Sequence, residues 1–269
     1  MGVSIIMCKR NKMKVLILGH RGMAGHIIYA YMRRKGYSAI SADELLGFEF
    51  DALKHLNELG EKFEENPVDY VINCIGLLVK KCEENPIEAI KINSLFPHQL
   101  VKIADKIGAQ IIHLSTDCYL DDNVYGRSKR AGEINYSNHL TIRTSIIGPE
   151  LKKDGTGLFE WFMRQKGEIK GYTNVMWGGV TTLELAKFIG WYIEKEDKLF
   201  GIRNLRSSQS ISKYDLLNLI KKIYKKDIKI NRFDEIKEDK TEKNDFLEYK
   251  IPTYEQMIKE MLKFQNNSP

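Results

Sequence analysis

The sequence predicts an α/β fold built on a doubly wound parallel sheet. Short apolar segments alternate with amphipathic helical segments through the first 148 residues. The first apolar segment runs directly into a glycine-rich turn, Gly19 to Gly25, which is followed by a helical pattern. Such alternation favours parallel strands joined by right-handed crossovers. A strand, a Gly-rich turn and a helix in that order are typical of a dinucleotide-binding opening.

The overall composition is that of an ordinary globular protein. The chain has 269 residues, 43% hydrophobic residues and a net charge of +6. Its densest basic cluster (Lys221, Lys222, Lys225 and Lys226) lies on an amphipathic helical pattern with no interleaved aromatic residues, so we interpret it as a solvated face and expect no nucleic-acid partner. No run of 18 apolar residues exists, so no membrane-spanning segment is expected.

The N-terminus and the cysteines indicate the compartment. The first twelve residues contain too short an apolar run for a signal peptide, and we expect an N-terminal extension with Met13 as a candidate natural start. Cys8, Cys74, Cys82 and Cys118 lack the paired spacing of a metal site, so reduced thiols and no metal are expected. Together these features predict a cytoplasmic protein.

The elements of the first half follow from apolar runs bounded by turn residues. Strands are expected at residues 13–19, 37–41, 68–76, 110–114 and 139–146. Asp43 is expected just past the second strand, and Asp51 is expected to begin the next helix. The longest helix is expected from Pro86 to Ile107, and it carries Asn93.

After Gly148 and Pro149 the alternation loosens. A polar loop is expected at 152–157, and a strand that returns to the sheet is expected at 200–205. A charged stretch occupies 234–245. Helices are expected at 158–164, 182–194, 212–225 and 254–264. Ser212 is a candidate N-cap. These pieces are too small for a separate core. We therefore predict a dinucleotide-binding domain at 13–148, joined by 180–206, and a smaller substrate-binding lobe formed by 149–179 and 207–269.

Side chains suited to proton transfer gather at one predicted strand end. An apolar strand places Ser115, Thr116 and Asp117 at its carboxyl end, where open parallel sheets bind ligands. Tyr125 and Lys129 follow four residues apart and project from one helix face. A Thr hydroxyl, a Tyr hydroxyl and a Lys ammonium suit proton transfer to a carbonyl oxygen during hydride transfer. The lysine is expected to lower the tyrosine pKa from about 10. A Tyr and a Lys at this spacing also occur by chance in helices.

With these residues the chain resembles the extended short-chain dehydrogenase/reductases, and within them the dTDP-4-dehydrorhamnose reductase family. The resemblance spans Met13 to Phe264 and rests on GHRGMAG, INCIG, INSLFP, LSTD, YGRSK followed by AGE, IRTSIIGP, GGVTTLELA and ISKYDLLNLI. The segments INCIGLLVKKCEENP, STDC and IRTSIIGP are most similar to bacterial reductases of UDP-linked N-acetylated 6-deoxy-4-keto sugars used for surface polysaccharides. The resemblance implies reduction of the C4 keto group of a nucleotide-activated 6-deoxy sugar. It leaves the nucleotide, the sugar and the oligomeric state open, with a homodimer as one option.

The resemblance also implies a role for each matching residue. Tyr125 would give a proton to the C4 carbonyl oxygen, Thr116 would hold that oxygen, and Lys129 would bond the nicotinamide ribose. The cofactor would contact Gly19, His20, Arg21, Gly22, Met23, Gly25, Asp51, Gly76, Leu77, Leu78 and Ser115, besides Tyr125 and Lys129. The sugar nucleotide would contact Thr116, Asp117, Ile146, Trp177 and Lys213.

The cofactor preference depends on two residues near the first turn. Arg21 stands where the related GDP-fucose synthases, which open with a similar GHRGM, hold the 2′-phosphate of NADP, and a guanidinium suits that contact. Asp43 could instead bond the free 2′-hydroxyl of NAD. We therefore expect NADP(H), with NAD(H) as the alternative.

Two departures from the family pattern limit these expectations. Thr116 and Tyr125 are only nine positions apart, which is far shorter than the family's usual connection. Nine extended residues still span the distance, but the cover over the sugar is reduced. Cys118 matches an epimerisation cysteine of the GDP-fucose synthases, yet no histidine follows His139 to act as the second acid/base group. The alternatives are therefore a combined epimerase/reductase using Cys118, or a non-catalytic regulatory subunit that binds the same ligands.

Overall fold

The computed structural model describes residues 13–152, 155–239 and 241–267, and its centre is a six-stranded parallel sheet. The expected N-terminal extension lies outside these residues. In spatial order the strands are β2 (Ser38–Ser41), β1 (Lys14–Leu18), β3 (Tyr70–Asn73), β4 (Gln110–Leu114), β5 (Leu140–Arg143) and β9 (Gly201–Asn204). All five neighbouring pairs are parallel. The strand order changes direction between β1 and β3, so the crevice for a ligand lies at their carboxyl ends.

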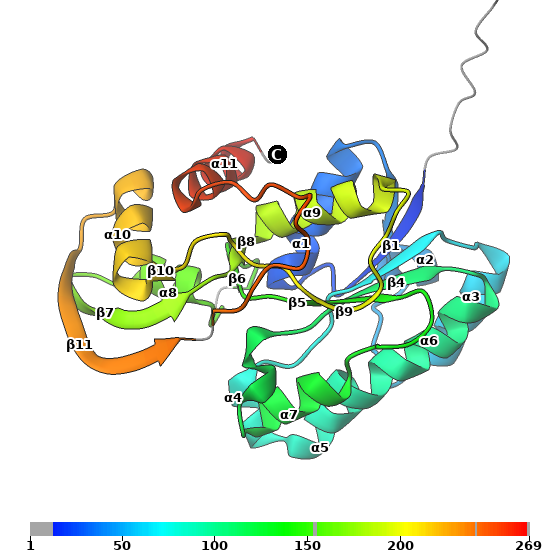
Figure 1. Ribbon diagram of the computed structural model, residues 1–269. Coiled ribbons are helices and arrows are strands. Elements are labelled where there is room, and N and C mark those ends of the chain that lie inside the picture. Colours follow the sequence, from blue (N-terminus) through cyan, green and yellow to red (C-terminus); the bar gives the residue numbers. More distant parts are fainter. Residues whose placement is uncertain (1–12, 153–154, 240, 268–269) are drawn as a thin grey trace, which may run out of the picture.

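Helices cover both faces of this sheet (Figure 1). Helices α1 (Met23–Arg34) and α9 (Thr182–Glu194) pack together on one face. Helices α3 (Leu56–Glu65) and α6 (Phe96–Lys106) lie on the other. Alternate residues of β1 enter the two cores, because successive side chains of a strand point to opposite faces. Burial on both sides explains the uninterrupted apolar run, and the predicted doubly wound α/β fold is confirmed.

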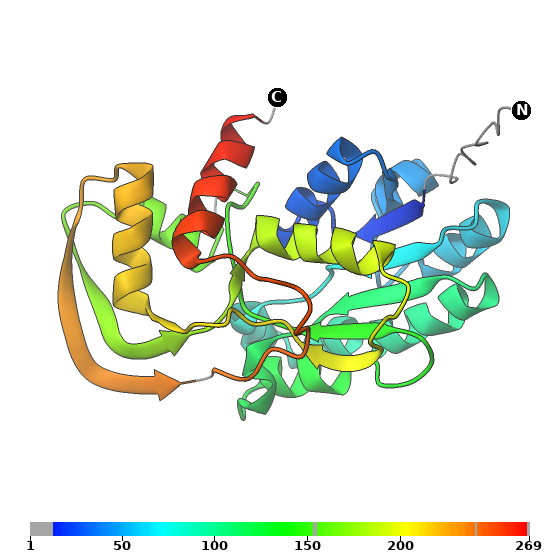
Figure 2. The same ribbon diagram turned by 45° about the horizontal axis from the view of Figure 1, so that its top comes forward.

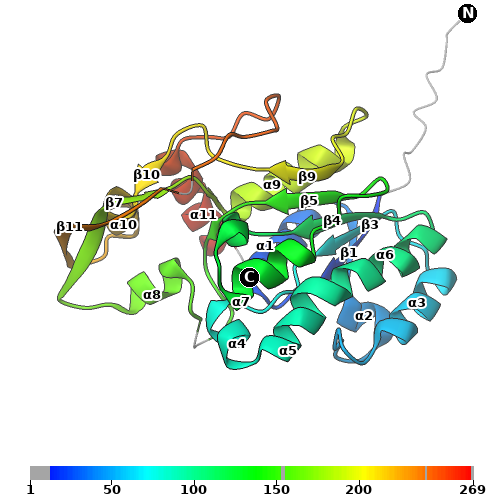
Figure 3. The same cartoon turned by 60° about the horizontal axis from the view of Figure 1, so that its bottom comes forward.

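The long helix carrying Asn93 has an irregular centre. It begins as α5 (Pro86–Ala89), continues as the π-helical turn η1 (Ile90–Leu95) and ends as α6. The short helix α4 (Val79–Glu84) precedes it, and all of these helices lie below the sheet in Figure 3. A π turn inside an α-helix is rare and often marks a functional site.

The short connection after β4 is closely packed. It forms the 3-10 turn η2 (Asp117–Leu120) and leads into α7 (Val124–Ala131). The side chain of Asn123 caps α7 by accepting a hydrogen bond from Gly126 N at 2.7 Å. A β-carbon at Gly126 would lie 2.5 Å from the carbonyl oxygens of Cys118 and Asp121. Glycine at this position therefore lets α7 approach the turn closely enough for a short connection.

The C-terminal part forms a second, smaller set of elements (Figures 1 and 2). A three-stranded sheet has the order β10 (Ile211–Ser212), β7 (Glu168–Trp177), β11 (Lys229–Asp239). A two-stranded pair joins β6 (Ile146–Ile147) to β8 (Val180–Thr181). The helices are α8 (Leu158–Arg164), α10 (Lys213–Tyr224) and α11 (Tyr254–Asn266), and Ser212 caps α10 by accepting from Asp215 N at 3.0 Å.

Several boundaries differ from the sequence expectations. Strands β7 and β11 were not expected. Strand β11 is charged and mostly exposed, and it has no alternating apolar pattern that would indicate a strand. Its pairing with β7 supplies the backbone hydrogen bonds instead. The strand expected at 139–146 is divided into β5 and β6. Asp51 does not begin a helix, since α2 (Ala42–Leu46) ends before it and α3 begins at Leu56.

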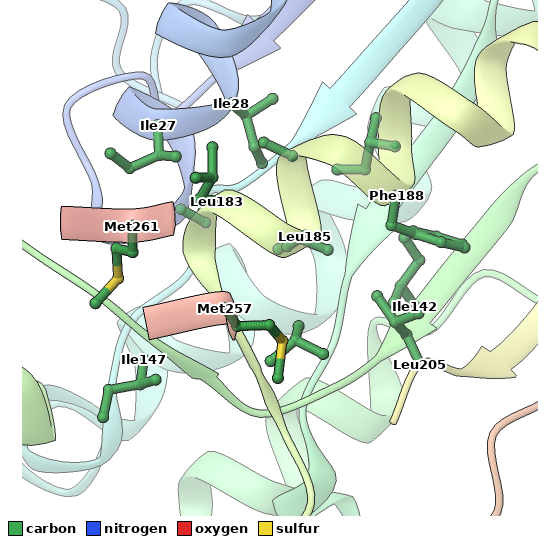
Figure 4. Packing of buried hydrophobic residues seen from close by; sticks show 14 of the residues in the cluster. Ile27, Ile28, Ile142, Ile147, Leu183, Leu185, Phe188, Leu205, Met257 and Met261 are labelled. Atoms are coloured by element: carbon green, nitrogen blue, oxygen red, sulfur yellow. The ribbon is translucent and has the colours of Figure 1, made fainter. Parts of the chain in front are cut away.

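One core joins the lobe to the main sheet (Figure 4). Ile142 of β5, Leu185 of α9 and Met257 of α11 belong to the same buried cluster as residues of α10. The lobe therefore does not fold around a core of its own. Within the described ranges, no helix is both long and apolar enough to cross a membrane.

Candidate functional site

The glycine-rich turn after β1 is shaped by close backbone contacts. Gly19 has a φ of +74°, and its carbonyl oxygen accepts a hydrogen bond from Gly22 N at 2.9 Å. A β-carbon at Gly25 would lie 2.1 Å from that same oxygen, so the start of α1 can pass the turn only with glycine there. The free amides at the N-terminus of α1 form a favourable site for an anion such as a pyrophosphate.

His20, Arg21 and Asp43 meet beside this turn. With Tyr29, Ser41, Glu44 and Gly47 they line a depression of about 450 Å³. Arg21 Nη2 lies 2.7 Å from Asp43 Oδ2, and Arg21 Nη1 lies 2.6 Å from Glu49 Oε1. The Arg21 side chain is 56% exposed and therefore accessible to a ligand. The two residues weighed for the ribose 2′ position thus form an ion pair with each other.

Asp51 is engaged locally. Its Oδ1 accepts a hydrogen bond from Leu53 N at 2.9 Å, and its Oδ2 lies 3.3 Å from Lys54 Nζ. The backbone hydrogen bond is the main cause that lowers the pKa of the Asp51 carboxyl. Asp51 is not among the residues that line the depression next to Arg21.

The carboxyl end of β4 brings the predicted proton-transfer residues together. Lys129 Nζ donates a hydrogen bond to the Leu114 carbonyl oxygen at 2.7 Å. Thr116 Oγ1 accepts from Cys118 N at 3.1 Å, which fixes the hydroxyl at the start of η2. The Tyr125 phenol lies close enough to the Thr116 side chain to interact with it. Threonine, tyrosine and lysine side chains therefore converge on one strand end despite the short connection.

The pKa of Tyr125 differs from the sequence expectation. Burial raises the pKa of the Tyr125 phenol above its ordinary value, and the interaction with Thr116 opposes this only in part. The expected lowering by Lys129 is not found in this arrangement, because burial of the phenol dominates its pKa. Burial also lowers the Lys129 pKa to about 8, against the opposing charge of Glu133. The phenol is protonated at neutral pH, as it would already be at the ordinary tyrosine pKa of about 10, and this is the form that can donate a proton.

Asn93 holds the loop after β3 against this cluster. Its Oδ1 accepts from Leu77 N at 2.8 Å, and its Nδ2 donates to the Leu77 carbonyl oxygen at 3.1 Å and to Ser128 Oγ at 3.2 Å. A β-carbon at Gly76 would lie 3.5 Å from Lys129 Nζ, so this loop passes directly over the lysine. Asn93 stood in a recognised segment, but the sequence assigned it no role.

The Ser115 hydroxyl is hydrogen-bonded to a buried carboxylate. Its hydroxyl donates to Glu133 Oε1 at 2.8 Å. Glu133 also accepts two hydrogen bonds from Arg143, at 2.7 Å from Nε and 2.6 Å from Nη2. The Arg143 guanidinium lies 3.4 Å from the ring centroid of Tyr119. Ser115 is thus part of a buried ion-pair network beneath the site, which the sequence did not indicate.

A second cavity lies on the lobe side of the strand end. It measures about 210 Å³ and is lined by Asp117, Cys118, Ser145, Ile146, Ile147, Leu158, Val175, Met176, Trp177, Lys213 and Glu238. Four of the five residues predicted to contact the sugar nucleotide are in this set, and the fifth, Thr116, is adjacent to Asp117. The indole of Trp177 is held in place because its Nε1 donates to Ser145 Oγ at 2.9 Å.

Two contacts from the C-terminal part reach the short connection. Tyr119 Oη donates to Glu242 Oε1 at 2.6 Å. Arg206 Nη1 lies 3.2 Å from Asp117 Oδ2. Neither partner was predicted, because a lone arginine after a strand and a glutamate in a charged stretch give no sequence signal.

The low pKa of Lys129 predicts a specific pH dependence of stability. A free lysine has a pKa of about 10.4, whereas burial lowers the folded-state pKa of Lys129 to about 8. Between these values the unfolded chain binds the proton and the folded protein does not, so the free energy of unfolding rises with pH. Relative to Lys129→Met, the parent should gain about 1.4 kcal/mol per pH unit across this window.

Urea unfolding of both proteins at pH 7, 8, 9 and 10 measures this difference. Groups other than Lys129 affect both proteins alike and cancel. A stability difference that stays constant from pH 7 to pH 10 would contradict the depressed pKa.

Comparisons with known proteins agree with the fold and the motifs. Residues 13–263 match the family described as RmlD substrate binding domain. A dTDP-4-dehydrorhamnose reductase of Mycolicibacterium smegmatis is 30% identical over 139 residues, covering 45% of this chain and 40% of that protein. The spore coat polysaccharide biosynthesis protein SpsK of Bacillus subtilis is 27% identical over 154 residues, covering 50% and 53%. The alignments thus span about half or less of these relatives' lengths.

Solved structures show the same fold. A dTDP-4-dehydrorhamnose reductase of Clostridium acetobutylicum superposes with a TM-score of 0.76 at 23% identity, over 94% of this chain and 100% of that one. A dTDP-4-dehydrorhamnose reductase of Bacillus anthracis in complex with NADP gives a TM-score of 0.78 at 17% identity, over 96% and 100%. Since the family match covers nearly the whole described chain, the protein belongs to the RmlD substrate binding domain family.

Proposed function

We propose that the protein is an NADP(H)-dependent reductase of the C4 keto group of a nucleotide-activated 6-deoxy sugar. The observation that carries this proposal is the convergence of Thr116, Tyr125 and Lys129 at the end of β4, next to a cavity lined by Asp117 and Trp177. A protonated phenol at the strand end next to this cavity suits reduction of a carbonyl. Family membership and the names of the relatives support the same reaction.

The chain's own residues would divide the work as follows. Tyr125 donates a proton to the carbonyl oxygen, because its phenol is protonated at neutral pH and lies beside Thr116 at the strand end. The Thr116 hydroxyl accepts from Cys118 N and donates to Asp117 Oδ1 at 3.4 Å, and it would turn its proton to the same carbonyl oxygen when substrate binds. Lys129 is fixed by the Leu114 carbonyl next to Gly76 and would bond the cofactor ribose. When bound, the nicotinamide supplies the hydride.

The residues around the first turn fit a dinucleotide. The Gly19–Gly25 contact leaves the N-terminal amides of α1 open to a pyrophosphate, and the depression lined by His20, Arg21 and Asp43 suits an adenosine ribose. We assign residues 13–148 and 180–206 to this cofactor side, and 149–179 with 207–269 to the sugar side. The resemblance places Asp51 at the adenine, and there its carboxylate would keep or exchange its 3.3 Å contact with Lys54.

Arg21 should determine the preference for NADPH over NADH. Arg21→Ala is expected to weaken NADPH binding by about 1.5–3 kcal/mol, the range for hydrogen bonds to charged groups. We expect a loss at the lower end of this range, because Arg21 is exposed and a 2′-phosphate must compete with Asp43 for the Arg21 guanidinium. NADH affinity should be almost unchanged. Fluorescence titration with both cofactors measures these affinities. An equal loss of affinity for NADPH and NADH would contradict the assignment of Arg21 to the 2′-phosphate.

The substrate class follows from the cavity and the sequence segments together. Met176, Val175 and Ile146 give apolar walls for a 6-deoxy carbon, while Lys213 offers a charge for the diphosphate. The nucleotide is dTDP, as named for the relatives, or UDP carrying an N-acetylated sugar, as the sequence segments indicate. In either case the product would serve surface polysaccharide synthesis.

The direct test is oxidation of NADPH in the presence of a panel of nucleotide 4-keto-6-deoxy sugars. We expect absorbance loss at 340 nm with at least one member. Deuterium uptake from solvent at the sugar carbons next to the carbonyl would identify the epimerase/reductase alternative, for which Cys118 lies in the cavity. Tight binding of cofactor and sugar without any turnover would identify the regulatory alternative.

A further inference from the structure

Arg206 is a fully buried arginine next to the proposed site. Its side chain is 1% exposed, and its Nη1 lies 3.2 Å from Asp117 Oδ2. Its Nε and Nη2 have no hydrogen-bond partner within the described part of the chain. A buried guanidinium is costly unless a carboxylate compensates it. The ion pair with Asp117 is therefore the contact that offsets the cost of burying the Arg206 guanidinium.

The backbone around Arg206 is fixed on both sides. Leu205 N donates to the Arg143 carbonyl oxygen at 3.0 Å, and Ser207 N donates to the Gly178 carbonyl oxygen at 2.8 Å. Arg206 N itself donates to Asn244 Oδ1 at 3.3 Å. The guanidinium thus extends toward Asp117 from a rigid anchor between the main sheet and the lobe.

Asp117 uses its two carboxylate oxygens differently. Oδ2 contacts Arg206, while Oδ1 lies 3.4 Å from Thr116 Oγ1 and 3.6 Å from Cys118 Sγ. The residue lines the cavity, and its side chain is 12% exposed. Each carboxylate oxygen can accept more than one hydrogen bond. With Oδ2 held by the guanidinium, the carboxylate stays oriented, and acceptor capacity is left for a donor in the cavity.

We propose that Arg206 is a positioning residue that fixes the Asp117 carboxylate to accept a hydrogen bond from the sugar. The group recognised is a hydroxyl or amide N–H on the sugar part of the substrate. This inference rests on the proposed function, because it needs the cavity next to Asp117 to hold the sugar. Arg206 acts through Asp117 and does not itself line the cavity.

The expected effect is on the KM of the sugar nucleotide. Arg206→Met leaves Asp117 free to turn, and the loss of a well-oriented bond to a charged group corresponds to a roughly 10- to 100-fold higher KM. The kcat should change less, because Tyr125 and Thr116 keep their contact. Arg206→Lys keeps the positive charge but lacks the planar guanidinium, so it should restore part of the affinity for the sugar nucleotide.

The matched control is Arg203→Met. Arg203 lies on β9 three residues earlier, and its Nη1 donates to the Ile202 carbonyl oxygen. Each variant is assayed as the full chain with NADPH and with dTDP-4-dehydrorhamnose or a UDP-linked N-acetylated 4-keto-6-deoxy sugar. The readouts are kcat, KM, the Kd of NADPH and Tm. Arg203→Met should leave KM within about twofold of the parent value, well below the tenfold change at the low end for Arg206→Met.

A thermodynamic cycle with Asp117→Asn separates positioning from a general structural role. If Arg206 acts through Asp117, the double variant should have the KM of Asp117→Asn alone, because the two residues form one unit. The double variant also removes both charges together, so it avoids an uncompensated buried charge if Arg206→Met fails to fold. A parent-like KM for folded Arg206→Met, or multiplied effects in the double variant, would overturn the proposal.

Failure of the proposed function is distinguishable in the same experiment. If the parent turns over no sugar nucleotide, that function fails, and the variants are compared by calorimetric binding of the same two sugar nucleotides. Weaker binding by Arg206→Met, with an unchanged Kd for NADPH, then supports the positioning role. Absence of sugar-nucleotide binding by the parent overturns both.

Discussion

Tyr125→Phe should lower the turnover of a nucleotide 4-keto sugar by roughly 10²- to 10⁴-fold, the range for one acid/base group. The phenol, which is protonated at neutral pH, is the proton donor of the proposed reaction. Phenylalanine keeps the ring but cannot supply the proton. Steady-state turnover with saturating NADPH measures the loss.

The cofactor should bind Tyr125→Phe almost as well as the parent, because Lys129 and the first turn are unchanged. Tyr136→Phe is the matched control, since Tyr136 is exposed and its hydroxyl bonds His98 at 2.8 Å, outside the site. Parent-like turnover by Tyr125→Phe would exclude the phenol as the donor. It would then favour the regulatory alternative or a proton from solvent.

Glu133→Gln should cost about 3–5 kcal/mol of unfolding free energy, as expected for removing one partner of a buried ion pair. Glu133 is buried and holds Arg143 through two hydrogen bonds, so the variant leaves the guanidinium without its carboxylate. The amide oxygen of glutamine can still accept from Ser115. The lower end of the range applies, because the Arg143 side chain is 17% exposed.

Urea unfolding at pH 7 measures this loss, and Glu84→Gln is the control. Glu84 lies 3.8 Å from Lys80 on the exposed face of α4, where an ion pair contributes less than about 1 kcal/mol. If both variants lose similar stability, the Glu133–Arg143 pair is not a buried support of the site.

The helices and the local motifs were predictable because their signals lie within short stretches of chain. Helix α9 was expected at 182–194 and lies there, and Ser212 caps α10 as expected. Both depend on periodicity or on a side chain bonding to a backbone amide three residues away. The boundaries that failed, at Asp51 and between β5 and β6, depend on turns that the apolar pattern does not encode.

Strands β7 and β11 show the limit of pattern reasoning. Strand β11 has charged residues on both faces, so its periodicity resembles that of a solvated loop. It is a strand because β7, more than fifty residues earlier, offers a matching row of backbone donors and acceptors. Pairing between distant segments is decided only when the chain is folded.

The sequence by itself determined the doubly wound sheet, the glycine turn and the meeting of Thr116, Tyr125 and Lys129, because strand ends and helix spacing fix these positions locally. Only the tertiary structure decided the ionisation of these groups and their partners. The Tyr125 pKa rises because burial in the folded chain disfavours the charged phenolate. Asp117 faces Arg206, 89 residues away, because β9 returns to the sheet beside β5 and places that guanidinium within hydrogen-bonding distance of the site.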